Sequence, residues 1–256
     1  MKAYKTIEVQ IRDGVARLTF KRPEVLNAMN AAMMDEIIDG LQFILAEASV
    51  RVAIISGRGK AFMAGADIKE YANLSESEFK RFQQNGLKLY DLIEQAAIPF
   101  IAAINGFALG GGFEIALSCD LVVASASAKM GLPEVHLGLI PGGGGTQRLL
   151  QKSGLNRVKE ILFLGQSYTA AAMYDFGIVN MVCDEGLFDE TVTDLAEKLK
   201  RRPAQSLRVL KRMLRPSSVE EPFSRRLDIE ADEVLHLFQT PVARERIQTF
   251  AEKNKK

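Results

Sequence analysis

The segment from Ile98 to Leu117 places the strongest constraint on the fold, because its twenty residues hold a single charge. That charge is Glu114, two residues after the run Gly110-Gly111-Gly112. An ionised group among apolar neighbours costs several kcal/mol unless it is paired or neutralised. Pro99, Asn105 and four glycines make the segment unsuitable as a membrane span. We therefore expect a strand, a turn and a buried helix here.

The composition is that of an ordinary globular protein. Apolar residues make up 47% and charged residues 25% of the 256 residues, enough for one large domain with a sizeable core. The net charge of +1 gives no overall field that favours nucleic acid or an anionic membrane as a partner. Residues 1–14 lack the continuous apolar core of a signal peptide, so we expect a cytoplasmic or similarly reducing location.

The cysteines and histidines argue against a disulfide framework and a metal centre. Cys119 and Cys183 are far apart in apolar contexts, which favours buried thiols. His136 and His236 cannot form a histidine-rich metal site by themselves. We therefore expect no metal.

The apolar pattern in the first two-thirds of the chain alternates short strands with helices, which indicates an α/β layer architecture. Asp13-Gly14 is a hairpin signal between the first two strands. Asn30 is a helix cap, and Ser75 with Glu78 forms a capping box for the next helix. The predicted strands are Ile7–Arg12, Val15–Phe20, Val52–Ser56, Pro99–Ile104 and Leu121–Ala124.

Residues 187–256 are predicted to be mostly helical, with prolines between the helices. We expect two regions, an α/β core over residues 1–186 and a helical C-terminal region over residues 187–256. The expected helices are Leu187–Lys200, Ala204–Leu214, Val219–Phe238 and Val242–Lys253.

A basic stretch, Lys198–Arg215, holds eight basic residues and no acid. Such a run is typical of a solvated helix face. The alternatives are a site for a phosphorylated ligand and, with less support, a site for RNA.

Two glycine clusters, Gly110–Gly112 and Gly142–Gly145, lie close in sequence to acidic residues. Neither gives a P-loop or a dinucleotide-binding fingerprint. Glycines at a helix start leave free N–H groups at the positive end of the helix dipole, which favours an anion or an oxygen that becomes negative during a reaction. The alternative is plain packing, where strand and helix backbones touch.

A second carboxylate, Glu134, follows Gly131-Leu132-Pro133 and lies, like Glu114, in a largely apolar run. Two such carboxylates suggest an acid/base pair in which one stays ionised while the other is held protonated. The alternative is a buried salt bridge for each, with Arg148 as a candidate partner.

Three long motifs carry a resemblance that covers the chain from about Ile7 to Lys253. They read KAFMAGADIKE (Lys60–Glu70), NGFALGGGFEIALSCDLVVA (Asn105–Ala124) and GLPEVHLGLIPGGGGTQRL (Gly131–Leu149). In this order and spacing they resemble the crotonase superfamily, and most closely the enoyl-CoA hydratases. The early KRPEVLNAMN (Lys21–Asn30) is similar to the first loop of that family.

The resemblance implies a spiral of repeated ββα units followed by a helical C-terminal region that covers the active site and takes part in trimerisation. It implies an acyl-CoA thioester as substrate, with no further cofactor and no metal. It also implies a homotrimer, or a hexamer that is a dimer of trimers.

The family's catalytic groups fall on four residues of this chain. The two backbone N–H donors of its oxyanion hole fall on Ala66 and Gly111, and its two catalytic glutamates fall on Glu114 and Glu134. Following the family, Glu114 is expected to orient and deprotonate water and Glu134 to protonate C2. The residues alone do not order the two carboxylates.

The family's coenzyme A contacts also map onto this sequence, with two departures. The family commonly places an aromatic side chain of a neighbouring subunit against the adenine, where this chain has Val234, and the family's Thr-x-Asp…Glu-Gly run is altered over Thr240–Arg246. The implied contacts are Ala64, Ala66, Asp67, Ile68, Lys69, Gly111 and Lys253.

Retention of both acids favours an enoyl-CoA hydratase, which adds water reversibly to a 2-enoyl-CoA. A Δ3,Δ2-enoyl-CoA isomerase or another crotonase-type lyase is the alternative, and a non-catalytic RNA-binding protein is a third. The acyl group is not predicted. Apolar candidates for its pocket, which could equally be core, are Met63, Tyr71, Leu74, Phe79 and Leu139.

Overall fold

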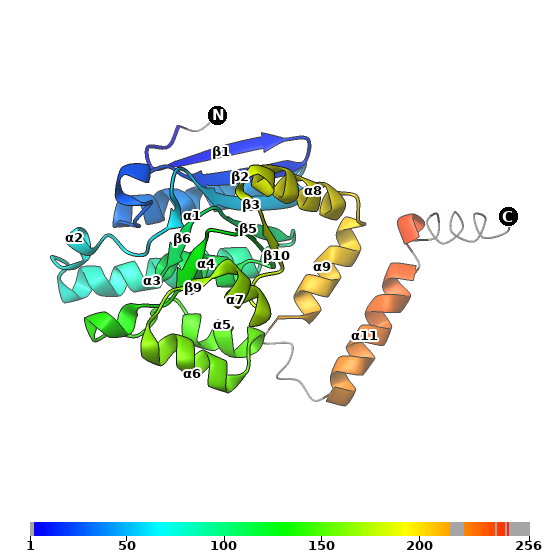
Figure 1. Cartoon of the computed structure of the whole chain (residues 1–256). Helices are drawn as coiled ribbons and strands as arrows, with labels where there is room; N and C mark the ends of the chain where they lie inside the picture. The colour runs from blue at the N-terminus through cyan, green and yellow to red at the C-terminus, as the bar shows by residue number, and fades with distance from the viewer. Residues whose placement is uncertain (1–2, 216–222, 239, 244, 246–256) are drawn as a thin grey trace.

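A computed structural model of the chain describes residues 3–215, 223–238, 240–243 and 245 (Figure 1). Within them, a larger sheet of six strands lies beside a smaller sheet of four. The larger sheet has the order β1 (Ile7–Arg12), β2 (Val15–Phe20), β3 (Val52–Gly57), β5 (Phe100–Ile104), β7 (Leu121–Ser125) and β10 (Met181–Cys183). The smaller has the order β4 (Ala61–Met63), β6 (Phe107–Leu109), β8 (Lys129–Gly131) and β9 (Tyr168–Thr169).

Helices connect and cover the strands. Those before residue 186 are α1 (Ala31–Ala46), α2 (Ile68–Tyr71), α3 (Glu76–Glu94), α4 (Gly111–Ser118), α5 (Gly145–Lys152), α6 (Leu155–Leu164) and α7 (Ala170–Asp175). The later ones are α8 (Phe188–Lys200), α9 (Ala204–Met213) and α11 (Phe223–Phe238). Short 3-10 helices are η1 (Pro23–Val25), η2 (Glu134–Leu137) and η3 (Glu185–Leu187).

The strand order confirms the expected spiral of ββα units. In each turn the chain adds one strand to the larger sheet, one to the smaller sheet, and then forms a helix: β3-β4-α3, β5-β6-α4 and β7-β8-α5. Strands β3, β5 and β7 pair in parallel, as do β4, β6 and β8. Parallel neighbours require such crossover connections, because a tight turn cannot join them.

The local signals in the sequence are confirmed. β1 and β2 pair antiparallel around Asp13 and Gly14, whose positive φ angles of 50° and 78° are those of a tight hairpin turn. The Asn30 side chain accepts a hydrogen bond from the Met33 N–H at the start of α1. Ser75 and Glu78 form a capping box at the start of α3.

The larger sheet separates two apolar cores. Alternate residues of its strands face opposite sides, so Ala53 and Ile55 of β3 pack in the main core with α1, α3 and α4. Val52 and Ile54 instead pack against Phe188 and neighbouring residues of α8. The first helix after residue 186 therefore covers the second face of the sheet. The boundary between residues 186 and 187 remains a prediction.

The last described helices lie at one side of the molecule. Figure 1 shows α9 and α11 next to each other, and the two helices are in contact. An ion pair between Arg212 of α9 and Glu233 of α11 joins them. The predicted helix Val219–Phe238 is described from Phe223 onward, and most of the predicted helix Val242–Lys253 lies outside the described residues.

Two sequence expectations need correction. The thiol of Cys119 is buried, but Cys183 is only half-buried, because it lies on the edge strand β10. The basic stretch is not simply a solvated face, because Lys211 turns inward with its side chain 8% exposed. Its ammonium donates to the Asp120 carboxylate at 2.7 Å and to the carbonyls of Ile93 and Ile98 at 2.9 and 3.0 Å.

The contact between α4 and β4 leads to a stability prediction. A Cβ atom on Gly112 would lie 2.2 Å from the carbonyl oxygen of Met63, so one of the two elements must shift. We expect Gly112→Ala to lower the free energy of unfolding by about 1–3 kcal/mol, measured by urea unfolding. Gly186→Ala is the matched control, because Gly186 is exposed and its Cβ would meet nothing within 4 Å, and it should change stability by less than about 0.5 kcal/mol. Equal effects of the two changes would contradict this packing.

Candidate active site

A cavity of about 320 Å³ opens between α2, α3 and the first turn of α4. Its wall includes the segment between β4 and α2, the first turn of α4, the 3-10 helix η2 and the glycine loop before α5. These four segments come from the three motifs singled out above, which are far apart in sequence. The predicted residues that line the cavity are Ala64, Ala66, Ile68, Gly111, Glu114 and Glu134.

Two backbone N–H groups on this wall are left out of the sheet and helix bonding. Met29 forms a parallel bridge at Ala66, but its hydrogen bonds are to the residues on either side of Ala66. The Met29 N–H donates to the Gly65 carbonyl at 2.8 Å, and the Asp67 N–H donates to the Met29 carbonyl at 2.9 Å. The N–H of Ala66 therefore points away from Met29. Gly111 is the first residue of α4, so its N–H has no acceptor within the helix and lies at the positive end of its dipole.

Gly110 turns the chain from β6 into α4. Its φ of 51° and ψ of −129° are in a region that only glycine adopts without strain. Its own N–H donates to the carbonyl of Gly131 on β8 at 3.0 Å, which ties this turn to the smaller sheet. The three glycines thus have different tasks, because Gly112 makes the close contact with β4 described above.

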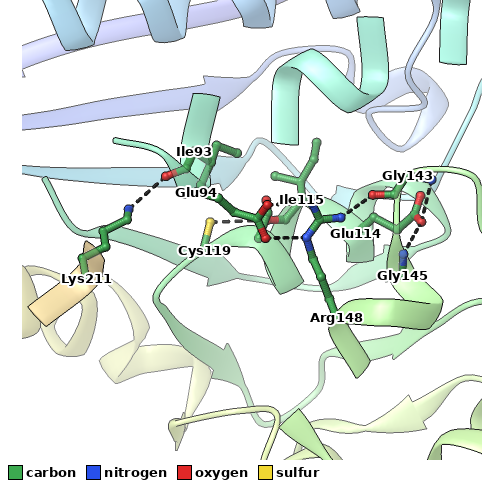
Figure 2. A network of polar contacts seen from close by, with 10 residues as sticks. Ile93, Glu94, Glu114, Ile115, Cys119, Gly143, Gly145, Arg148 and Lys211 are labelled. Carbon is green, nitrogen blue, oxygen red and sulfur yellow. Dashed lines mark hydrogen bonds and ion pairs between the residues drawn. The ribbon is translucent and has the colours of Figure 1, made fainter. Parts of the chain in front are cut away.

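The Glu114 carboxylate is 3% exposed and is held by the second glycine cluster. Its Oε1 accepts hydrogen bonds from the N–H groups of Gly143 and Gly145, each 2.8 Å long (Figure 2). The Tyr90 hydroxyl lies 3.5 Å from Oε2. Burial raises the pKa of Glu114, and the two backbone donors oppose part of that rise.

The glycine loop contacts Glu114 so closely that a side chain would not fit. A Cβ on Gly143 would lie 2.1 Å from the ring of Tyr90 and 2.7 Å from Oε2 of Glu114. A Cβ on Gly145 would lie 2.9 Å from Leu132. Gly143 and Gly145 are therefore explained by their approach to a buried carboxylate, and both the packing and the anion-binding interpretations of a glycine run apply to them. A Cβ on Gly142 would instead meet Gln83, and a Cβ on Gly144 would meet Arg148.

Glu134, on the facing η2, has a different environment. Its Oε2 is buried and has no hydrogen-bond partner among the residues that the structure describes. Burial, with a further contribution from the negative charge of Glu114, raises the pKa of Glu134 to about 7. A carboxyl oxygen buried without a donor favours the neutral, protonated form. The two carboxyls thus differ in the way expected for an acid/base pair, since only Glu114 has backbone donors from the opposite wall.

Arg148, the candidate salt-bridge partner in the alternative interpretation, does not pair with either cavity carboxylate. The Arg148 guanidinium instead pairs with Glu94, with its Nε 2.6 Å from Oε1 and its second terminal nitrogen 2.8 Å from Oε2. It still acts on Glu114 from a distance, because its positive charge lowers the pKa of that carboxyl. Its third contact is a hydrogen bond to the carbonyl of Gly143.

The predicted coenzyme A contacts are only partly brought together. Asp67 and Lys69 are not among the residues that line the cavity, and the Asp67 carboxylate pairs with Arg22 at 3.0 Å. Lys253 lies outside the described residues. Val234 is exposed on α11. The altered run Thr240–Arg246 is described only in part.

Only some of the candidates for the acyl pocket line the cavity. Tyr71 and Leu139 line the cavity, whereas Met63 is fully buried behind Gly112. Leu74 is not among the lining residues, and the Phe79 ring packs edge-on against Tyr71 with 5.3 Å between centroids.

One face of α3 was missed as part of the site. Phe82, Gly86 and Tyr90 line the cavity, and they recur every four residues along that helix. Such spacing places side chains on one face of a helix, so the pattern was present in the sequence. It could not be distinguished from a core-facing stripe, because the same residue types serve both purposes.

The described residues contain no group of three or more histidine, cysteine, aspartate or glutamate residues that could hold a metal ion. No helix among them combines the length and apolar character needed to cross a bilayer.

Comparison with known proteins supplies relatives over almost the whole chain. A family model described as enoyl-CoA hydratase/isomerase matches residues 10–256. A crotonyl-CoA hydratase of Syntrophomonas wolfei is 36% identical over 254 residues, which covers 99% of this chain and 97% of the relative. A short-chain-enoyl-CoA hydratase of Clostridium acetobutylicum is 35% identical over 242 residues, with 94% and 92% coverage. The crystal structure of an enoyl-CoA hydratase from Bacillus anthracis superposes with a TM-score of 0.92 at 34% identity and covers 97% of each chain.

The pKa of Glu134 leads to a prediction about stability and pH. The native state keeps the Glu134 proton up to about pH 7, whereas an unfolded glutamate loses it near pH 4.3. Stability is therefore lost as the pH rises through this window, and Glu134→Gln, which stays neutral, escapes that loss. Solvent near the cavity screens part of the effect, so we expect the variant to gain about 1 kcal/mol relative to wild type between pH 5 and pH 8.

The measurement is urea or thermal unfolding of both proteins at the two pH values. Asp194→Asn, at an exposed position on α8, serves as a control for the loss of a carboxylate. A difference between Glu134→Gln and wild type that stays constant from pH 5 to pH 8 would show that Glu134 ionises in the folded protein like a solvated glutamate.

Proposed function

The chain belongs to the enoyl-CoA hydratase/isomerase family and has its crotonase fold, and we propose that it is an enoyl-CoA hydratase. The reaction is the reversible syn addition of water to a 2-enoyl-CoA, which gives a 3-hydroxyacyl-CoA. The observation that carries the proposal is one cavity lined by two carboxyls of different environment, Glu114 and Glu134, and by two residues with backbone N–H donors, Ala66 and Gly111.

The N–H donors suit the charge that develops in this reaction. When water adds to C3, an electron pair moves from the double bond through C2 onto the thioester oxygen. We assign the stabilisation of this enolate to the N–H groups of Ala66 and Gly111, with the dipole of α4 adding to the second. Backbone donors need no side chain, and both positions hold residues small enough for the thioester oxygen to approach.

We assign the water molecule to Glu114. Its Oε1 is occupied by the two glycine N–H groups, so Oε2, near the Tyr90 hydroxyl, is the oxygen that would accept the water proton as the new O–C3 bond forms. Its two backbone donors favour the ionised form that a base requires.

We assign the C2 proton to Glu134. With a pKa near 7, this carboxyl holds a proton in a large share of molecules at neutral pH, and it can give that proton to C2 as the enolate collapses. One proton is taken by Glu114 and one is given by Glu134, so the protein returns to its starting state by exchange with solvent. A water molecule that bridges both carboxyls would couple their titrations.

A Δ3,Δ2-enoyl-CoA isomerase is the second candidate, supported by the family description and by the raised pKa of Glu134, since one carboxyl near neutrality suffices to move a proton between carbons. Reaction in ¹⁸O-labelled water distinguishes the two. Hydration places the label in the product, whereas isomerisation does not.

The substrate class and assembly extend the proposal. Membership of the family implies an acyl-CoA substrate. We propose a homotrimer or a hexamer, and the exposed apolar side chains on the C-terminal helices, such as Leu214 and Val234, are consistent with further burial on assembly.

Loss of either carboxylic acid should remove most of the activity. We expect Glu114→Gln and Glu134→Gln each to lower kcat for crotonyl-CoA by about 10²–10⁴-fold, because each removes one proton transfer. The assay follows loss of the conjugated thioester absorbance. Asp194→Asn on α8 should retain the wild-type rate. A wild-type rate in Glu134→Gln would refute its assigned role, and a wild-type protein that binds enoyl-CoAs without hydrating them would refute the hydratase.

The Gly111 donor can be tested without removing any side chain. Proline is well tolerated at the first position of a helix, where its ring Cδ takes the place of the amide hydrogen. A Cβ at Gly111 would make ordinary 3.4 Å contacts with Met29 and Tyr90. We therefore expect Gly111→Pro to fold and to lose about 10²–10³-fold in kcat, since one oxyanion donor is gone. Gly111→Ala keeps the N–H and is the control. If the two variants are equally active, this N–H does not stabilise the transition state.

A further inference from the structure

Arg148 and Glu94 form a pair that the proposed mechanism has not used. They come from α5 and α3, and the guanidinium meets the carboxylate through two parallel bonds of 2.6 and 2.8 Å (Figure 2). The side chains are 13% and 27% exposed. Two parallel bonds of this kind fix the orientation of the guanidinium plane as well as its position.

The remaining face of Arg148 is directed at the glycine loop. Its other terminal nitrogen donates to the carbonyl of Gly143, whose N–H donates to Glu114 (Figure 2). Both backbone polar groups of Gly143 are thus hydrogen-bonded, the carbonyl to Arg148 and the N–H to Glu114. The guanidinium also lies 5.3 Å from the ring centroid of Tyr90, whose hydroxyl faces Glu114.

The loop needs such a support, because it cannot support itself. A glycine segment has more conformational freedom to lose than any other, so its N–H groups point at Glu114 only where something else restricts the backbone. Gly143 and Gly144 carry no side chain that could do so. Arg148 lies in α5, the helix that follows the loop. Its side chain contacts the loop at Gly143 and is itself fixed by Glu94.

We propose that Arg148, held by Glu94, is a positioning residue that fixes the Gly143 backbone so that Glu114 is oriented and kept ionised for reaction with water. This rests on the role proposed above for Glu114. Arg148 need not touch the substrate, because it acts through the peptide groups of the loop and through its charge.

The positive charge of Arg148 should affect how the reaction rate depends on pH. The titratable groups that face Glu114 are Tyr71 of α2, Tyr90 of α3, Glu134 of η2 and Arg148 of α5. Among them Arg148 is the cation, and it lowers the pKa of Glu114. Its removal should therefore raise that pKa and move the acid limb of the profile of kcat/KM against pH to higher pH.

The experiment compares wild type with Arg148→Gln, Arg148→Lys and Glu94→Gln. Arg157→Gln is the matched control, because Arg157 also pairs with a glutamate, Glu160 at 2.5 Å, and lies 4.2 Å from an aromatic ring centroid, but on α6. Hydrogen exchange measured by mass spectrometry reports the amides of the 142–147 segment, and steady-state kinetics on crotonyl-CoA report kcat, KM and the pH profile.

We expect Arg148→Gln to speed amide exchange in residues 142–147, to lower kcat by about 10–100-fold with little change in KM, and to shift the acid limb upward. Arg148→Lys keeps the charge and should restore much of the pH profile but less of the exchange protection. Glu94→Gln should produce an intermediate loss. Arg157→Gln should leave all three measurements at wild-type values.

Two outcomes overturn the proposal. One is wild-type loop exchange and pH profile in Arg148→Gln; the other is a loss of activity that follows the loss of thermal stability equally in Arg148→Gln and Arg157→Gln. If Arg148→Gln does not fold, Arg148→Lys and Glu94→Gln decide by the same criteria. A wild-type protein without hydratase activity refutes the proposed function instead, while loop exchange still reports whether Arg148 holds the loop.

Discussion

The arrangement of the site depends on one interaction, the binding of the buried Glu114 carboxylate by the N–H groups of Gly143 and Gly145. A carboxylate that is 3% exposed would otherwise have to be neutralised or paired with a cation. Backbone donors hold it without a permanent salt bridge, so one oxygen remains for chemistry. The glycines at positions 143 and 145 follow, since a side chain at either would collide with Tyr90, Leu132 or Glu114 itself.

The spiral explains how residues so far apart in sequence meet. Each ββα turn passes from the larger to the smaller sheet, and the smaller-sheet strands β4, β6 and β8 lie side by side. The segments that follow them carry Ala66, Gly111 and Glu134 respectively, so three successive turns each deliver one group to the same cavity. The fourth group, Glu114, comes with Gly111 on α4. The unequal surroundings of the two carboxyls result from this topology, because Glu114 faces the glycine loop and Glu134 does not.

Much of this could be predicted from the sequence, for identifiable reasons. The Asp13-Gly14 hairpin, the Asn30 cap and the Ser75–Glu78 capping box are local, so residues close in sequence determine them. The likeness of three motifs to a known family implied the spiral. The ion-pair partners of half-buried and buried basic side chains could not be predicted in this way. Arg148 pairs with Glu94 of a helix distant in sequence, and Lys211, within a basic stretch, pairs with Asp120. Such pairs depend on how helices pack, which composition and spacing do not determine.

We propose that the thioester oxygen of the substrate binds between the N–H groups of Ala66 and Gly111 while the β-carbon faces Glu114. A crystal structure of the protein with a bound acyl-CoA would reveal this arrangement. We expect the thioester oxygen about 2.7–3.1 Å from both nitrogens, with C2 beside Glu134 and C3 beside Glu114. A thioester oxygen bound elsewhere, with either N–H left out of contact with the ligand, would contradict it.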